Sequence, residues 1–246
     1  MRKVLLGLGI GVLCLPMLFV GWLLLASRWA KMDGSTMQAP MALRQTVAAL
    51  VLQKATFGKA GMPAVDRVLR LDPENAGAWQ RRCSVYIWNN DTPSVKDCQK
   101  AVELGKEPYS YYNLGRAQDA TNDPCSAEES YTAAVSATAT NPDFEYVRSM
   151  GQSALRCGHL PAAKAGLNLA VELEGKAMND PDQDDDETAN IKKDMLADRE
   201  YLLVAYQRGG EDTLAGQACT VAHPGWKGCR CDLDAKGKVG CSEVKR

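Results

Sequence analysis

Histidine is scarce in this sequence, and cationic side chains do not outnumber anionic ones. The 246 residues include 2 histidines, His159 and His223, too few for a metal centre built from several imidazoles. Lysine and arginine total 29 against 30 aspartates and glutamates, for a formal net charge of −1. Because a nucleic-acid-binding protein generally needs a surplus of cations, we expect no nucleic-acid partner.

Motifs of the common catalytic sites are also missing. The chain has no phosphate-binding glycine loop, no H-E-x-x-H pair and no G-x-S-x-G nucleophile turn. His159 follows Gly158 in an expected turn between helices, where a surface histidine is far commoner than a catalytic one. We therefore expect no enzyme, no catalytic residue, no bound metal and no cofactor. The 46% hydrophobic and 24% charged residues are typical of a folded protein.

A long uncharged segment opens the chain. Residues 4–26 contain no charged side chain, and as a helix they would extend about 34 Å, enough to cross a hydrocarbon core of roughly 30 Å. The run is longer than the apolar part of a cleaved secretory signal, and the residues behind it match a cleavage site poorly. We predict a single-pass transmembrane anchor in residues 1–31 and a polar linker over 32–41. Arg2, Lys3 and the amino terminus favour a cytoplasmic N-terminus by a small margin, which puts the bulk of the chain on the non-cytoplasmic side, the periplasm in a bacterium.

Cysteine, in contrast, is abundant. Of the 9 cysteines, Cys14 lies in the predicted span, and the other eight form an even number that favours disulfides in an oxidising, non-cytoplasmic compartment. These eight are Cys83, Cys98, Cys125, Cys157, Cys219, Cys229, Cys231 and Cys241. Free buried thiols are the alternative for the first four.

An internal repeat of about 34 residues follows the linker. Trp79, Cys83 and Tyr86 form a W-x3-C-x2-Y pattern that predicts one face of a helix. Small residues recur in the same register at Cys83, Gly115 and Gly151, and on the expected second helices at Gly61, Ser94, Ala127 and Ala163. Small side chains at these positions allow paired helices to approach each other closely.

This pattern resembles the tetratricopeptide repeat (TPR) family, with its W-x2-L-G-x2-Y, A-x3-F and P positions. The resemblance covers about residues 42–175 and implies an all-α fold, a TPR-type solenoid of antiparallel helix pairs, which we predict over 42–178. Two residues depart from the pattern: Arg82 stands where the family has leucine, and Gln118 where it has an aromatic residue.

An acidic segment and a further helix are expected after the repeats. The aspartates of residues 179–190 suggest a calcium loop, but such a loop needs glycine in place of Asp185 and glutamate in place of Ile191. We therefore predict a solvated linker whose carboxylates favour the N-terminus of the next helix. That helix, at about 188–208 and assigned to residues 191–210, carries an apolar stripe suited to capping the solenoid.

Residues 211–246 form a cysteine-rich tail, predicted as loops and a hairpin turning at 234–237. A disulfide-stapled appendage, a zinc site of four thiolates with His223, and a redox-active dithiol at Cys229 and Cys231 are the three interpretations. In the first, the hairpin brings Cys231 opposite Cys241 and leaves Cys219 to pair with Cys229, presenting Trp226 near the tip of the loop.

The TPR resemblance also implies two disulfides and a binding surface. Cys83 and Cys98 would lie on facing helices of one repeat, and Cys125 and Cys157 in adjacent bends of successive repeats. First helices of TPR pairs line a concave groove that commonly receives a peptide, although an ordinary solvated face is the alternative here. The register puts on this face Gln80, Ser84, Tyr109, Tyr112, Arg116, Asp119, Arg148 and Gln152. We predict a membrane-anchored scaffold or adaptor for another protein, in envelope assembly, and as the alternative a thiol-disulfide or metal-handling protein acting through its tail.

Overall fold

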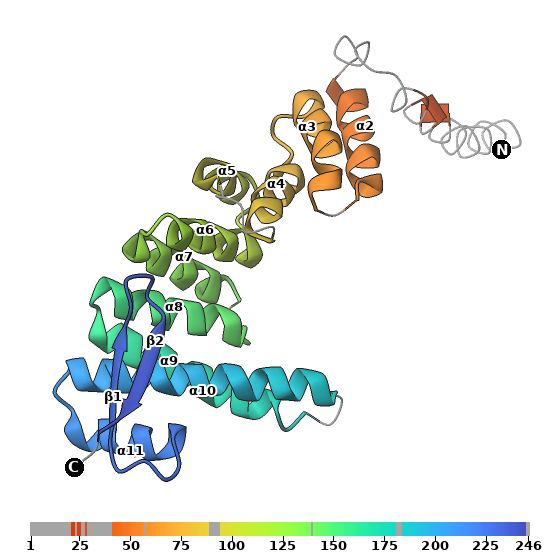
Figure 1. Cartoon of the computed structure of the whole chain (residues 1–246). Coiled ribbons are helices and arrows are strands. Elements are labelled where there is room, and N and C mark those ends of the chain that lie inside the picture. Colours follow the sequence, from red (N-terminus) through yellow and green to blue (C-terminus); the bar gives the residue numbers. More distant parts are fainter. Residues whose placement is uncertain are drawn as a thin grey trace, which may run out of the picture.

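The computed structural model describes residues 21, 22, 24, 25, 28, 41–56, 58–88, 94–138, 140–180 and 184–244. Within these residues, helices joined by short turns stack in pairs from α2 and α3 at one end to α10 and α11 at the other, where a two-stranded sheet lies across them (Figure 1). The first pairs are α2 (Met41–Lys54) with α3 (Met62–Leu71), preceded by a 3-10 turn (Lys59–Gly61), and α4 (Ala76–Trp88) with α5 (Val95–Gly105). The next are α6 (Pro108–Ala120) with α7 (Pro124–Ala137), α8 (Phe144–Cys157) with α9 (Leu160–Ala177), and α10 (Asp185–Arg208) with α11 (Asp212–Ala222).

Polar residues in the turns start the helices. The side chain of Ser94 accepts a hydrogen bond from the Asp97 N–H at the start of α5, and Asp123 accepts one from the Ser126 N–H at the start of α7. Each cap satisfies a backbone donor that has no partner inside its helix. Gly158 ends α8 with a φ of 90°, a conformation that glycine adopts without steric strain.

Glycine allows the two helices of a pair to touch. A Cβ added to Gly115 would lie 2.6 Å from the Tyr131 ring, and one added to Gly151 would lie 2.8 Å from the Leu167 backbone nitrogen. Neither distance is possible for a real side chain without movement of the neighbouring helix. The small residues of the repeat therefore mark the points of closest approach inside the pairs.

Arg82 replaces the family's leucine with a polar link between helices. Its guanidinium donates two hydrogen bonds of 2.8 Å to the carboxylate of Asp97 on α5, and it lies 3.4 Å from Asp66 on α3. It also lies over the ring of Trp79, 4.4 Å from the ring centroid. The ion pairs with Asp97 and Asp66 thus hold α4 against both of its neighbours, and the cation–π contact with Trp79, which lies on α4 itself, helps to orient the guanidinium.

Helix α10 begins earlier than the predicted capping helix at 191–210, and it takes up half of the predicted acidic linker at 179–190. Asp184 caps it by accepting a 2.7 Å hydrogen bond from the Glu187 N–H, and its first turn is acidic. These carboxylates stabilise the positive end of the helix dipole, so they extend the helix into the acidic segment.

The tail contains a helix that the sequence analysis missed. Helix α11 occupies the start of residues 211–246, which we had expected to be loops and a hairpin, and its buried residues Ala215, Cys219 and Ala222 are spaced four and three apart. This stripe is short and made of small side chains, a weak signal for a helix. The expected hairpin follows as β1 (Cys229–Leu233) and β2 (Val239–Glu243), antiparallel, with Cys231 opposite Cys241.

Four disulfides link the described cysteines. They are Cys83–Cys98, Cys125–Cys157, Cys219–Cys229 and Cys231–Cys241, the four pairs expected from the sequence. Their Cα–Cα distances of 5.0, 5.0, 5.6 and 4.1 Å are all below the roughly 7 Å beyond which a bridge cannot form. In this oxidised state the tail has no thiolate to offer zinc, and Cys229 and Cys231 are not bonded to each other.

The predicted membrane span at residues 4–26 lies almost entirely outside the described residues. Of the predicted linker at 32–41, only Met41 is among the described residues. Among the helices that are described, none combines the length and the apolar character that a membrane crossing requires.

Candidate protein-binding surface

Two neighbouring pockets open along α4 and α6, and Gln80 and Tyr109 line both of them. The smaller, of about 530 Å³, lies between these helices and the end of α2. The larger, of about 980 Å³, lies between the starts of α6 and α8 and the end of α9. The smaller is also lined by Leu52, Gly58, Gly77, Arg81, Ser84 and Val85. The larger is also lined by Glu107, Pro108, Thr138, Asn141, Pro142, Asp143, Phe144, Tyr146, Leu173, Lys176, Ala177 and Asp180.

Tyrosines form the wall between α6 and α8. The ring centroid of Tyr112 lies 4.7 Å from that of Tyr146, 5.6 Å from that of Tyr131 and 6.5 Å from that of Tyr109. Burial, followed by the negative charge of Asp143, raises the pKa of Tyr146 to about 12, and burial also raises the pKa of Tyr112. These phenols therefore stay neutral at physiological pH and present apolar area together with hydroxyl groups.

The rim of the larger pocket is acidic. Glu107 and Asp143, the residues that precede α6 and α8, are exposed there, and so is Asp180. Among the described residues that line this opening, Lys176 carries the one ammonium group, and it pairs with the Glu172 carboxylate on its own helix at 2.6 Å. The carboxylates of Glu107 and Asp143 against one paired lysine give this opening a negative potential.

Of the eight residues that the TPR register put on the groove, Gln80, Ser84 and Tyr109 line the pockets directly. Tyr112 lies behind them in the tyrosine wall, and the Arg116 guanidinium lies 5.8 Å from the Tyr112 ring centroid. The Ser84 hydroxyl accepts a 3.0 Å hydrogen bond from the buried Asn113 side chain, which fixes α6 against α4.

Asp119 is turned into the helix stack instead. Its carboxylate accepts hydrogen bonds from Arg156 at 2.7 Å, from Ser153 at 3.0 Å and from the Tyr131 hydroxyl at 3.2 Å. Burial raises its pKa, and the positive charge of Arg156 opposes that rise. Its contacts join α6, α7 and α8, which is a structural role.

Arg148 and Gln152 point toward α9 and α10 for a similar reason. Arg148 lies 2.7 Å from Asp194, 3.7 Å from Glu174 and 4.0 Å from Asp198, and the Gln152 amide donates a 2.9 Å hydrogen bond to Asp198. The repeat register predicts which helix carries these side chains. It does not show that α10 packs beside α8 and supplies them with buried partners.

Part of the larger pocket lies outside the surface predicted from the sequence. Phe144 and Tyr146 on α8, Leu173 on α9, and Thr138, Asn141, Pro142 and Asp143 between α7 and α8 all contribute to it. The prediction covers only the exposed faces of first helices, whereas this pocket is also lined by the turn between two repeats and by the end of a second helix. The tyrosines spaced around this turn were the available signal.

No known protein family matches the sequence, and no curated protein matches it. Among solved structures, the chain is similar to the MamA protein, with a TM-score of 0.50 and 16% identity over 74% of this chain and 89% of that one. It is also similar to YrrB, a TPR protein described as having an unusual peptide-binding site, with a TM-score of 0.52 and 17% identity over 76% and 88% of the two chains. These likenesses show a TPR-like fold.

Proposed function

We propose that this chain is a scaffold that binds a segment of another protein along α4, α6 and the start of α8. The observation that carries the proposal is the pair of neighbouring pockets that share Gln80 and Tyr109. An extended or helical peptide that lies on Tyr109 would contact both pockets at once. The peptide-binding site described for YrrB supports a protein or peptide ligand over a small molecule.

The residues that line the two pockets indicate which kind of peptide should bind. Tyrosine is enriched among residues that dominate binding energy, because its ring supplies area at low entropic cost and its hydroxyl supplies direction. The carboxylates of Glu107, Asp143 and Asp180 favour cations at the larger opening. The expected ligand is therefore a peptide with an apolar or proline side chain for the smaller pocket and a lysine or arginine for the larger.

The proposal includes a location. Residues 4–26 would anchor the chain in a membrane, with the repeats on the non-cytoplasmic side and the partner a protein of the cell envelope under assembly. The uncharged run supports the anchor, and the four disulfides support an oxidising compartment. Carbonate extraction of membranes from cells expressing the full chain, compared with a chain lacking residues 1–31, tests the anchor. Release of the full chain by carbonate would contradict it.

Site-specific photo-crosslinking tests the binding surface. A photoreactive amino acid at Tyr109 should capture a partner in native membranes, whereas the same group at the exposed Glu129 of α7, outside both pockets, should not. A synthetic peptide covering the captured segment then gives a dissociation constant with the purified full chain.

Two variants test which side chains determine that dissociation constant. Tyr109→Ala with Tyr146→Ala should weaken peptide binding by roughly tenfold or more, since both rings line the larger pocket. Tyr111→Ala is the matched control: it is half-buried on the same helix but lines neither pocket. Equal affinities for the double variant and the control, with both proteins folded by circular dichroism, would overturn the site assignment.

A further inference from the structure

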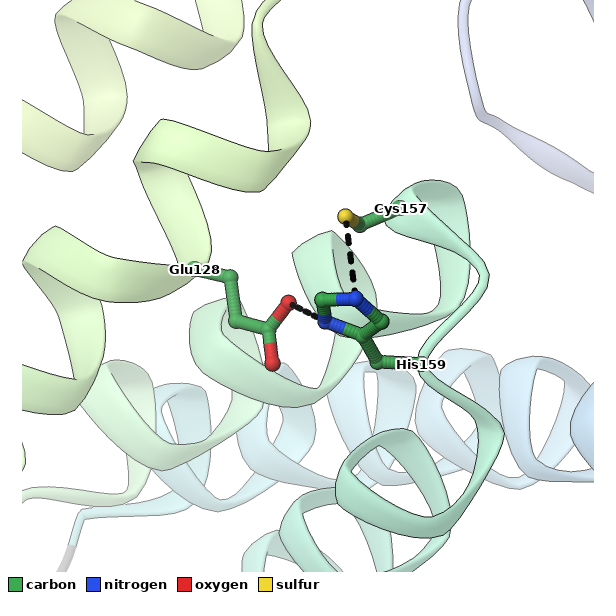
Figure 2. Close-up of side chains that lie close together, drawn as sticks. All are labelled: Glu128, Cys157 and His159. Atoms are coloured by element: carbon green, nitrogen blue, oxygen red, sulfur yellow. Dashed lines mark hydrogen bonds and ion pairs between the residues drawn. The ribbon is translucent and has the colours of Figure 1, made fainter.

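Three side chains, from two successive helices and the turn that follows them, meet at the surface between α7 and α9 (Figure 2). Glu128 comes from α7, Cys157 is the last residue of α8, and His159 precedes α9. The His159 Nδ1 lies 2.7 Å from the Glu128 Oε2, and its Nε2 lies 3.8 Å from the Cys157 Sγ. An imidazole is thus held by a carboxylate on one side and faces a sulfur atom on the other.

That sulfur belongs to the Cys125–Cys157 disulfide, the most accessible of the four in the described part of the chain. Cys125 is exposed and Cys157 half-buried. Each of the other three disulfides has at least one buried member, with exposed fractions of 1% for Cys83, 3% for Cys219 and 5% for Cys231. A thiol in solution therefore meets Cys125 first.

The surroundings stabilise negative charge on both sulfurs. Cys125 is the second residue of α7, where the free N–H groups and the positive end of the helix dipole favour a thiolate. Cys157 is at the opposite end of its helix, where the dipole disfavours one. His159 compensates there, because its ring nitrogens face the Glu128 carboxylate on one side and the Cys157 sulfur on the other, and an imidazolium can donate to both.

We propose that Cys125–Cys157 is a redox-active disulfide that exchanges with thiols, and that His159, oriented by Glu128, assists the departure of the Cys157 sulfur. The reductant is a small thiol or the dithiol of another protein. This inference does not depend on the proposed peptide-binding surface. The sequence suggested thiol-disulfide chemistry for the tail, whereas this proposal places such chemistry at the boundary between two repeats.

The exchange balances in two steps. A thiolate attacks the Cys125 Sγ, a new sulfur–sulfur bond forms there, and the electron pair of the old bond leaves with the Cys157 Sγ, which takes a proton from His159. A second thiolate then attacks the external sulfur of the mixed disulfide and releases Cys125 as a thiolate. The protein disulfide is reduced by two electrons, and two external thiols are oxidised to one disulfide.

Reduction would remove the covalent link between α7 and α8, the helices at the junction of two successive pairs. The junction would then rest on packing and on polar contacts such as those of Asp119 with Ser153 and Arg156 and that of Glu128 with His159. The thiol pair thus connects the redox state of the compartment to the stiffness of the helix stack beside the tyrosine wall.

Tryptic peptides make the experiment specific, because each of the eight cysteines falls in a different one: Cys125 in 117–148 and Cys157 in 157–164, for example. The folded full chain is incubated with reduced glutathione, quenched with acid, alkylated and analysed by mass spectrometry over time. Cys125 and Cys157 should be alkylated at least about tenfold faster than the other six, with glutathione first attached to Cys125.

Variants then test the role of the imidazole. His159→Gln should slow reduction of Cys125–Cys157 by roughly tenfold, and Glu128→Gln should slow it to a smaller extent, because thiol exchange is faster when the leaving thiolate is stabilised. His223→Gln is the matched control, since His223 lies 3.1 Å from Glu200 beside Cys241 in a second cluster of the same composition. It should leave the Cys125–Cys157 rate unchanged.

Two results would each overturn the proposal. One is reduction of Cys125–Cys157 no faster than that of Cys231–Cys241 in the unaltered protein. The other is a wild-type rate in both His159→Gln and Glu128→Gln. His159→Gln should fold normally because the His159 side chain is 63% exposed, and circular dichroism checks the fold of Glu128→Gln, whose side chain is 14% exposed.

Discussion

A buried pair of carboxyl groups should make this protein less stable as pH rises. Glu174 on α9 and Asp198 on α10 are both fully buried and share the Arg148 guanidinium, which lies closer to the half-buried Asp194. Within the described part of the chain, neither Glu174 oxygen accepts a hydrogen bond from a neighbouring donor. A proton on Glu174 lets it donate to Asp198, a bond that two ionised carboxylates cannot make.

The sign and the size follow from this arrangement. Burial, followed by the negative charge of Asp198, raises the pKa of Glu174 from 4.5 to about 8, and burial raises that of Asp198 from 3.8 to about 6. The unfolded chain releases the Glu174 proton near its ordinary pKa, whereas the folded chain keeps it up to about pH 8. The contribution is fully present below about pH 4.5 and lost as pH rises through 8. At about 1.4 kcal/mol per pKa unit, the loss is on the order of 4 to 5 kcal/mol.

Glu174→Gln isolates this effect, because an amide keeps a donor toward Asp198 at every pH. We expect the variant to match the wild type at pH 5 and to exceed its free energy of unfolding at pH 8 by on the order of 2–4 kcal/mol. Urea unfolding followed by circular dichroism across pH 5 to 8, with disulfides intact, measures both.

Glu172→Gln is the matched control on the same helix, since Glu172 is exposed and its ion pair, with Lys176, lies at the surface. Its pH profile should follow that of the wild type. Parallel profiles for Glu174→Gln and the wild type would refute the reasoning, because they would mean that Glu174 ionises in the folded protein as easily as in the unfolded one.

Two further predictions concern packing. Gly151→Ala should cost about 1–3 kcal/mol, because its Cβ would press on the Leu167 backbone, whereas Gly216→Ala on α11 meets nothing within 4 Å and should stabilise by up to about 1 kcal/mol; thermal unfolding of both variants checks the opposite signs. Arg82→Ala should cost about 1–3 kcal/mol, since it leaves the half-buried Asp97 carboxylate without its bidentate partner, and restoration by Asp97→Asn in the same chain would show that the loss lies in this pair.

The fold could be predicted from the repeat period because the period reflects a packing constraint. Gly115 and Gly151 must be small wherever paired helices touch, and that requirement is visible in the sequence at the period of the pairs. The tail hairpin was predictable for a related reason, since the turn at 234–237 sets which cysteines face each other across two short strands. Local geometry of this kind needs no knowledge of distant segments.

The orientation of individual side chains depends on contacts that have no period. Tyr112 and Arg148 occupy equivalent places in successive repeats, three residues before Gly115 and Gly151, yet Tyr112 packs against Tyr146 while Arg148 turns to the acids of α9 and α10. The difference arises because α10 packs beside α8, a contact between segments some 46 residues apart that also joins Gln152 to Asp198. Helix α11 was not predicted for the same reason, because its short stripe of small residues is stabilised by packing against α10.

The end of the helix stack shows why the tail disulfides and the Cys125–Cys157 disulfide should behave differently. The Gln207 amide donates to the Cys229 carbonyl and accepts from the Cys231 N–H, so a side chain of α10 completes the backbone bonding of β1. Cys219 and Cys231 are buried in the same apolar cluster as Leu203 and Val204 of α10. A reductant reaches Cys219 and Cys231 only after the hairpin leaves α10, which costs both the hydrogen bonds and the buried area, and their partners Cys229 and Cys241 are half-buried. No such opening precedes attack on the exposed Cys125, so the tail disulfides close the end of the solenoid while the inter-repeat disulfide stays open to exchange.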